Sequence, residues 1–287
     1  MCGIPRDEPR LLTATAVRDL ARRHGIHPSK ALGQHFVVDP NTIRRVVRLA
    51  GLTGSEHVLE VGAGLGTLTL GLAGASAGVT AVEIDRALLP ALEEVAGGLP
   101  NVRIVGADAM AVEWGPLLDA RGAGGWRMVS NLPYNIATPL VANMLEEVPQ
   151  IGDFVVMVQR EAGERLVAGP GSKVYGAVSV LVALHAEAAL LGSVPRTVFW
   201  PQPGVDSVLV RMTRRPAPVP VPPEPLMRVV RGAFSHRRKT LRNALSAALG
   251  AGVDEIEQAL HAAGVDPGAR AETLALEDFA RIAEVLG

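Results

Sequence analysis

The chain has 287 residues, of which 48% are hydrophobic and 20% are charged, and its 31 glycines and 21 prolines follow no fixed period. This composition excludes general disorder and a collagen-like fibre, and the length suits a main domain with a smaller second one. The formal net charge of -1, taken alone, argues against a protein that binds a polyanion.

A single cysteine, Cys2, excludes an intramolecular disulfide and a cysteine-rich zinc site, so we expect a reducing compartment and no metal. Asp7 and Glu8 stand where a signal peptide would need an apolar core. The longest apolar stretch, residues 178–192, is interrupted by polar groups and is shorter than the ~20 residues that a membrane span needs. We therefore expect a cytoplasmic protein without a membrane partner.

Short apolar runs alternate with helical patterns over residues 58–158. Such runs are typical of strands buried on both faces of a parallel sheet. The order β-α-β-α-β-β-α-β predicts an α/β fold, with an open, mostly parallel, Rossmann-like sheet and helices on both of its faces. The expected strands are 57–61, 79–84, 102–105, 127–130 and 154–158, and the expected helices are 68–74, 86–96 and 138–147.

A proline-rich segment, residues 216–225, divides the chain, because its six prolines remove backbone donors and favour an extended conformation. Before it a further, antiparallel strand pair is expected around 188–191 and 206–212, and after it the pattern is helical over 240–249, 254–263 and 276–286. We therefore predict three parts: a domain of residues 1–215 with a basic extension at 1–48, a linker at 216–225, and a small all-α domain at 226–287.

The net charge conceals two basic segments. Residues 1–48 hold nine Lys or Arg against four acids, and residues 205–246 hold nine against two, whereas 49–204 and 247–287 are acidic. Basic segments of this kind are what a phosphate backbone contacts. The alternative is that they are solvated helix faces.

A glycine-rich turn, Gly62-x-Gly64-x-Gly66, closes the first expected strand and opens a helix. Glycines there bring the backbone close to a ligand at the helix N-terminus, which favours a nucleotide-like ligand over a purely structural turn. The spacing lacks the third glycine of the dinucleotide fingerprint, which disfavours NAD.

Two acidic residues follow the next two strands. Glu83 comes about twenty residues after the glycines, where a carboxylate accepts hydrogen bonds from ribose hydroxyls, and Asp108 follows the third strand, where it can accept from an adenine amino group. Either residue alone is equally well an exposed carboxylate at a strand end. Together with the glycine turn they match the layout of a class I methyltransferase that uses adenosylmethionine.

The segment Asn131, Leu132, Pro133, Tyr134 follows the fourth strand and indicates the chemistry. An adenine amine is a poor nucleophile, and the Asn131 side-chain oxygen with a carbonyl of Leu132 or Pro133 can accept its two N–H groups. Pro133 stiffens the turn, and Tyr134 can stack on an unstacked base. The alternative is an ordinary turn with a buried tyrosine.

With these motifs the chain resembles the KsgA/RsmA family of ribosomal RNA small-subunit adenine dimethyltransferases. The resemblance covers nearly the whole sequence. It rests on residues 30–36, 60–66, 131–139, 199–207 and 234–243, the last of which contains Phe-Ser-His-Arg-Arg-Lys.

The resemblance implies roles for individual residues. It implies that His35, Val37, Gly62, Glu83, Asp108 and Asn131 bind the methyl donor, with Gly64 and Gly66 in the same turn. His35 is a departure, since the family usually has Asn there. Phe199 corresponds to an aromatic residue that sandwiches the target base against Tyr134.

A cluster of four basic residues, Arg237, Arg238, Lys239 and Arg242, lies in the second basic segment. At helical spacing Arg238 and Arg242 share a face, and we interpret the cluster as a contact to RNA phosphates.

The resemblance implies a monomeric enzyme that transfers methyl groups from S-adenosylmethionine, without a metal, to N6 of two adjacent adenosines. These lie in a hairpin loop near the 3′ end of 16S ribosomal RNA, in the small (30S) ribosomal subunit or its precursor. One alternative is an erythromycin-resistance type of methyltransferase acting on large-subunit RNA. Another is a ribosome-assembly factor in which methylation is incidental.

Overall fold

The computed structural model describes residues 9–29, 31–118, 125–236 and 238–287. The chain divides into two compact units. Unit 1 comprises Met1–Gly163 and Ala189–Arg214, and unit 2 comprises Glu164–Ala188 and Arg215–Gly287. None of the described helices is long and apolar enough to cross a membrane.

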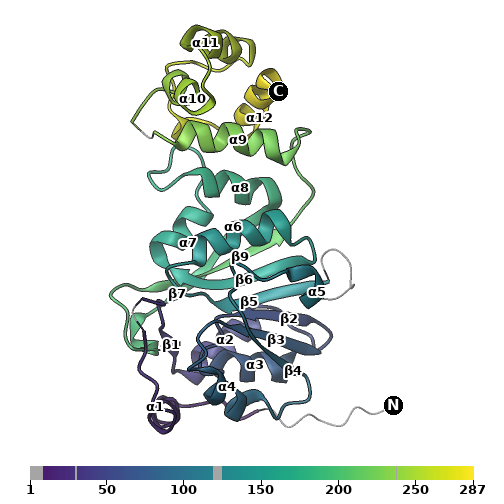
Figure 1. The fold of residues 1–287 in the computed structure, drawn as a ribbon, viewed down its shortest axis with the longest axis vertical. Helices are drawn as coiled ribbons and strands as arrows, with labels where there is room; N and C mark the ends of the chain where they lie inside the picture. Colours follow the sequence, from purple (N-terminus) through teal and green to yellow (C-terminus); the bar gives the residue numbers. More distant parts are fainter. Residues whose placement is uncertain (1–8, 30, 119–124, 237) are drawn as a thin grey trace. The chain divides into compact units, whose positions relative to one another are not determined.

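A seven-stranded sheet forms the centre of unit 1, in the order β4-β3-β2-β5-β6-β9-β7 (Figure 1). The pairs β2 with β3, β3 with β4, β2 with β5 and β5 with β6 are parallel, and β9 runs antiparallel to β6. The strands are β2 (His57–Val61), β3 (Gly78–Glu83), β4 (Val102–Gly106), β5 (Trp126–Asn131), β6 (Ile151–Gln159), β7 (Ala186–Val194) and β9 (Ser207–Arg214). A separate two-stranded ladder pairs β1 (Phe36–Val37) with β8 (Phe199–Trp200).

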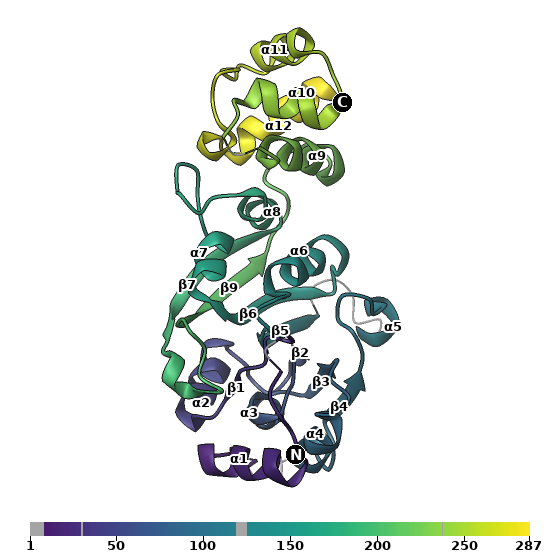
Figure 2. The same ribbon diagram turned by 60° about the vertical axis from the view of Figure 1, so that its left-hand side comes forward.

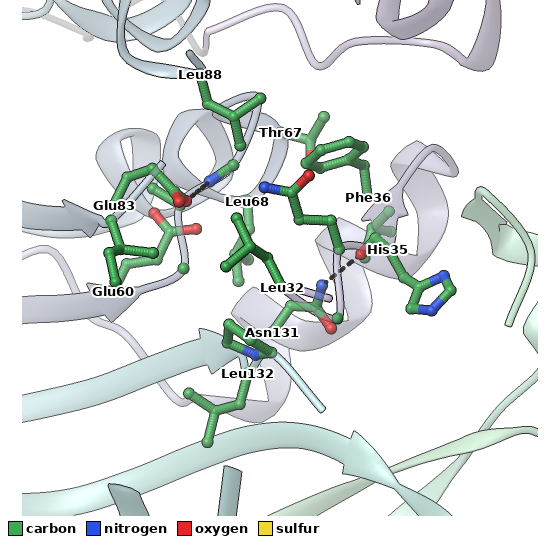
Figure 3. Close-up of a pocket in the computed structure, with 18 of the residues that line it drawn as sticks. Leu32, His35, Phe36, Glu60, Thr67, Leu68, Glu83, Leu88, Asn131 and Leu132 are labelled. Carbon is green, nitrogen blue, oxygen red and sulfur yellow. Dashed lines mark hydrogen bonds between the residues drawn. The ribbon is translucent and has the colours of Figure 1, made fainter. Parts of the chain in front are cut away.

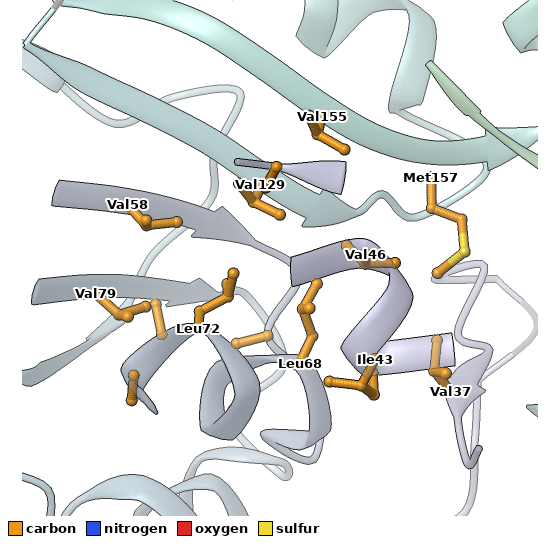
Figure 4. Packing of buried hydrophobic residues seen from close by; sticks show 14 of the residues in the cluster. Val37, Ile43, Val46, Val58, Leu68, Leu72, Val79, Val129, Val155 and Met157 are labelled. Carbon is orange, nitrogen blue, oxygen red and sulfur yellow. The ribbon is translucent and has the colours of Figure 1, made fainter. Parts of the chain in front are cut away.

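Helices cover both faces of this sheet because its strands are apolar on both sides. Figure 4 shows Val58, Val79 and Val129 packed against helices α2 and α3, and their neighbours in sequence point to the opposite face, where they are also buried. The helices of the first 163 residues are α1 (Ala14–Arg23), α2 (Pro40–Leu49), α3 (Thr67–Ala75), α4 (Leu89–Ala96), α5 (Trp114–Leu118), α6 (Ala137–Glu147) and α7 (Arg160–Leu166), the last of which crosses the boundary between the units.

Unit 2 is helical apart from the first residues of β7. A ring cluster of Tyr175, Phe234 and Phe279 joins three of its segments, and the Tyr175 hydroxyl donates to the Leu274 carbonyl at 3.1 Å. The helices, seen from a second direction in Figure 2, are α8 (Ala177–His185), α9 (Pro223–Phe234), α10 (Leu241–Leu249), α11 (Val253–Ala262) and α12 (Leu276–Leu286).

The predicted mostly parallel sheet with one antiparallel strand and the helical C-terminal region are confirmed. The structure differs from the predicted parts in two places. Residues 164–188 cluster with the C-terminal helices and not with the sheet, and α9 begins at Pro223, inside the predicted linker. Proline is well suited to the first turn of a helix, because its missing N–H would have no partner there. The sequence also failed to predict α1, α2, α5, α7 and α8.

Candidate active site

The candidate site is a pocket at the carboxyl ends of β2, β3 and β5 (Figure 3). It continues into a second lobe near the end of β4, and both lobes are lined by Leu32, Gly62, Glu83, Ile84 and Pro133. The first lobe is also lined by Gln34, His35, Phe36, Val37, Glu60, Gly64, Asn131, Leu132 and Tyr134, and the second by Ala107, Asp108, Ala109, Met110 and Asn135.

The glycine turn approaches its neighbours closely. Gly62, Gly64 and Gly66 have φ values of 76°, 58° and 78°, in the left-handed region. A Cβ at Gly62 would lie 2.9 Å from Pro133 Cδ, and one at Gly64 would lie 2.9 Å from the Phe36 ring. The turn therefore requires glycine for its conformation and for the space beside the pocket.

Glu83 ends β3 and is directed by two main-chain groups. Its Oε2 accepts from Gly64 N at 2.8 Å and its Oε1 from Asp85 N at 2.9 Å. Burial raises the pKa of Glu83. Each carboxylate oxygen keeps a second lone pair, so the pair can accept from two neighbouring hydroxyls. Asp108 lines the second lobe, where its Oδ1 accepts from Met110 N at 2.9 Å.

Asn131 ends β5 with one half of its amide bonded and the other half without a partner. Its Nδ2 donates to the His35 carbonyl at 2.9 Å (Figure 3). Its Oδ1 is buried and accepts no hydrogen bond from the described residues. A buried acceptor without a partner is costly in free energy, so this oxygen is available for an N–H donor in the pocket. The Pro133 carbonyl accepts from Ile136 N at 3.2 Å, which favours the Leu132 carbonyl as a second acceptor.

Tyr134 is held at both its hydroxyl and its ring. The hydroxyl lies 2.7 Å from Ser207 Oγ, and the ring centroid lies 5.1 Å from that of His35. Burial raises the pKa of Tyr134. His35 Nδ1 lies 2.7 Å from the Pro201 carbonyl, and the His35 ring points away from Glu83 (Figure 3). The His35 carbonyl therefore holds the Asn131 amide, and the His35 ring packs against the Tyr134 ring.

Val37 and Phe199 are paired across the β1–β8 ladder and are buried in the core, with 2% and 3% exposure. Val37 lines the pocket. The ring neighbour found for Tyr134 is His35 and not Phe199. Phe199 does not line the pocket, because its ring is packed in the same core cluster as Val37.

Glu60 lines the pocket and was not among the predicted site residues. It is 1% exposed and its Oε2 accepts from Thr69 Oγ1 at 2.6 Å. Burial, with a contribution from the charge of Glu83, raises the pKa of Glu60 to about 8. The signal was available in the sequence, since Glu60 precedes the first glycine of the turn by two residues.

The predicted basic cluster lies in unit 2. Arg237 is outside the described residues, and Arg238 and Lys239 are exposed. Arg242 donates to Glu257 from the first turn of α10. The expectation that Arg238 and Arg242 share a helical face is wrong, because the helix begins at Leu241, after an N-cap at Thr240.

No three His, Cys, Asp or Glu side chains of the described residues group in a way that could hold a metal ion. A mostly parallel sheet with a glycine turn, a buried carboxylate and, among the described residues, an unpartnered amide oxygen at its carboxyl edge is typical of a Rossmann-like methyltransferase.

The chain belongs to the ribosomal RNA adenine dimethylase family, whose model matches residues 27–287. It is 48% identical over 283 residues to ribosomal RNA small subunit methyltransferase A of Thermobifida fusca (strain YX), covering 96% of each chain. It is 50% identical over 278 residues to the protein of that name from Kineococcus radiotolerans, covering 95% of this chain and 91% of that one.

Two solved structures share the fold. A dimethyladenosine transferase from Plasmodium falciparum has a TM-score of 0.70 at 22% identity, over 85% of this chain and 94% of that one. The 23S rRNA methyltransferase ErmE has a TM-score of 0.64 at 29% identity, over 88% of this chain and 99% of that one.

Proposed function

We propose that this chain transfers methyl groups from S-adenosylmethionine to N6 of two adjacent adenosines near the 3′ end of 16S ribosomal RNA, dimethylating each. It acts as a monomer in the cytoplasm, on the small subunit or its precursor, during subunit biogenesis. The observation that carries the proposal is the buried Asn131 Oδ1, which has no hydrogen-bond partner among the described residues. The name shared by the relatives at 48% and 50% identity supports the choice of RNA.

The pocket suits the methyl donor in both lobes. Glu83 offers acceptors for two ribose hydroxyls, and Asp108 offers an acceptor for an adenine amine beside the apolar side chains of Ile84 and Met110. When bound, the donor supplies a methyl group on a sulfonium, an electrophile that needs no metal. The glycine turn allows the backbone of Gly62 to approach it.

The acceptor side of the site orients the adenine. Asn131 Oδ1 and the Leu132 carbonyl each accept one N–H of the amine, which directs the nitrogen lone pair toward the methyl group of the donor. Tyr134, held by Ser207, supplies a stacking surface for the base. Attack by a neutral amine on a sulfonium disperses charge, so positioning and exclusion of water contribute more than proton transfer.

The test of this assignment is Asn131→Ala. We expect kcat on undermethylated small subunits to fall by about 100-fold or more, the scale seen when one transition-state hydrogen bond is removed. The affinity for S-adenosylmethionine should change far less, because Glu83 and the glycine turn remain. The matched control is Asn41→Ala, at an exposed residue of α2. Full turnover by the Asn131 variant would contradict the proposed role.

The similarity to ErmE at 29% identity favours large-subunit RNA as the second candidate substrate. Separate incubation of undermethylated small and large subunits with the protein and donor distinguishes the two. Mass spectrometry should find dimethyladenosine in 16S RNA, and its appearance in 23S RNA alone would reverse the choice. A catalytically inactive variant that still supports normal subunit maturation would instead favour an assembly role.

A further inference from the structure

Three arginines from distant parts of unit 1 contact the end of β7 or the segment 204–206 that precedes β9. Arg45 Nη1 on α2 donates to the Ser193 carbonyl at 2.7 Å, and Arg160 Nη2 donates to Ser193 Oγ at 3.3 Å. Arg196 N donates to Asp206 Oδ1 at 2.9 Å, and Arg160 Nη2 lies 3.7 Å from Asp206 Oδ2. Of the three guanidinium groups, only that of Arg160 lies near a carboxylate, that of Asp206.

This group, the Arg45–Arg160–Arg196 cluster, lies next to the stacking surface of the site. Gln159, the last residue of β6, is in register with Ser207, whose Oγ contacts the Tyr134 hydroxyl. Arg160 is the next residue, and its N donates to the Asp206 carbonyl at 3.1 Å. Arg160 therefore follows the Gln159–Ser207 pair by one residue, and Ser207 is the residue that holds the Tyr134 hydroxyl.

The guanidinium groups of the cluster are oriented without being fully neutralised. Arg45 and Arg196 donate from Nη1 to the carbonyls of Ser193 and Gly204, which fix direction and carry no net charge. A guanidinium has five N–H donors, so one such bond leaves several for an anion. Arg196 is exposed, and the Arg160 side chain is 44% exposed.

Two other arginines of the same sheet differ from the cluster, because their guanidinium donors are bonded within the protein. Arg211 forms a two-pronged pair with Asp153, with distances of 2.8 and 3.3 Å. Arg214 donates to four carbonyls at the end of α6 and the start of β6, and its burial lowers its pKa. These two arginines stabilise the fold.

A glycine makes room for the cluster. Gly192 in β7 has a φ of 131°, and a Cβ there would lie 2.5 Å from Arg45 Nη2. A glycine inside a strand is a sign that another group approaches the backbone closely. Here the approaching group is the guanidinium of Arg45, a residue of α2.

We propose that the Arg45–Arg160–Arg196 cluster binds backbone phosphates of the substrate RNA, beside the nucleotide whose base stacks on Tyr134. The inference rests on the proposed function and adds to it a site for the phosphates that flank the target. Guanidinium groups suit this ligand because their paired donors match two phosphate oxygens. The cluster positions the RNA and does not take part in the methyl transfer.

The experiment compares the wild type with the triple variant Arg45→Gln, Arg160→Gln, Arg196→Gln on undermethylated small subunits over a range of KCl concentrations. We expect KM to rise about tenfold or more, with kcat at saturation and the affinity for S-adenosylmethionine nearly unchanged. The slope of log affinity against log salt should fall by about 2, since each phosphate contact contributes about 0.7 on single-stranded RNA.

The matched control removes the same charge outside the two basic segments, with Arg103→Gln, Lys173→Gln and Arg270→Gln, three exposed residues. A second variant that places Lys at the three cluster positions should keep most of the salt slope, because it keeps the charge. A cluster variant that matches the wild type, or a control that shifts KM and slope equally, would overturn the inference. A wild type that methylates no small-subunit RNA would contradict the proposed function instead.

Discussion

At the scale of single residues, the buried carboxyl of Glu60, which lines the pocket, makes the stability of the protein depend on pH. Its pKa is raised from the usual 4.5 to about 8, so Glu60 is mostly protonated at neutral pH in the free protein. The folded state therefore holds a proton that the unfolded state releases at lower pH. The resulting stabilisation is fully present below about pH 4.5 and is lost as the pH rises through about 8.

Glu60→Gln tests this. The neutral amide does not ionise, so we expect the unfolding free energy of the variant, relative to wild type, to increase between pH 4.5 and 8. The increase should be on the order of 3 to 5 kcal/mol as an upper bound. Urea unfolding at several pH values measures it. The exposed Glu255→Gln on α11 is the control, and parallel curves for wild type and Glu60→Gln would contradict the expectation.

Most of the donor-binding and catalytic residues predicted from the sequence line the pocket, but their contacts could not be predicted. Gly62, Glu83 and Asn131 line the pocket as expected, because each ends a parallel strand and such ends share one edge. The bond between Tyr134 and Ser207 joins residues 73 positions apart and follows from strand register. The burial of Phe199 likewise depends on how the short β1–β8 ladder packs, which no local pattern records.

At the scale of elements, the glycine turn between β2 and α3 packs against the loop that follows Asn131 and contains Pro133. Gly62→Ala introduces two effects. A left-handed backbone costs a residue with a Cβ about 1–2 kcal/mol, and the new Cβ would meet Pro133 Cδ at 2.9 Å. The contact between the new Cβ and Pro133 would displace either the glycine turn or the loop that contains Pro133.

Gly25→Ala is the matched control, since Gly25 has a φ of 62° with nothing within 4 Å of an added Cβ. We expect both variants to lose stability through backbone strain. Only Gly62→Ala should lose affinity for S-adenosylmethionine, by about tenfold or more, in isothermal titration calorimetry. Equal donor affinity in the two variants would show that the contact with Pro133 is unimportant.

The sequence patterns of the elements explain which of them were predicted and which were not. The central strands are continuous apolar runs bounded by turns, and these were found. Residues 177–194 are nearly all apolar in their first half, so no period marks the change from α8 to β7 at Ala186. For α1 and α2 a signal existed, because Thr13 and Asp39 cap them and their apolar positions have helical spacing.

At the scale of the whole molecule, folding decides which basic residues remain available to RNA. The segment 205–246 holds nine basic residues, of which Arg211 and Arg242 pair with acids and Arg214 with carbonyls. Arg238 and Lys239 stay exposed. Counting charge along the sequence identified the segment but could not separate these roles, because the partners come from other elements.

The two proposed RNA contacts lie in different units, the Arg45–Arg160–Arg196 cluster in unit 1 and the exposed pair Arg238 and Lys239 in unit 2. Replacing Arg238 and Lys239 by Ala should lower the salt slope of RNA binding by about 1, one phosphate contact or slightly more. When this double substitution is combined with the triple cluster variant, the two reductions in salt slope should add, because the two groups of residues share no partners.

Binding of small subunits over a range of KCl concentrations measures all three slopes. Arg242→Ala serves as the control, since the loss of its bond to Glu257 should lower the unfolding temperature with little effect on the salt slope. A combined variant with the slope of the triple variant alone would mean that RNA does not contact the pair in unit 2. Additive slopes would show that a protein with a net charge of -1 binds RNA through two basic surfaces, one on each unit.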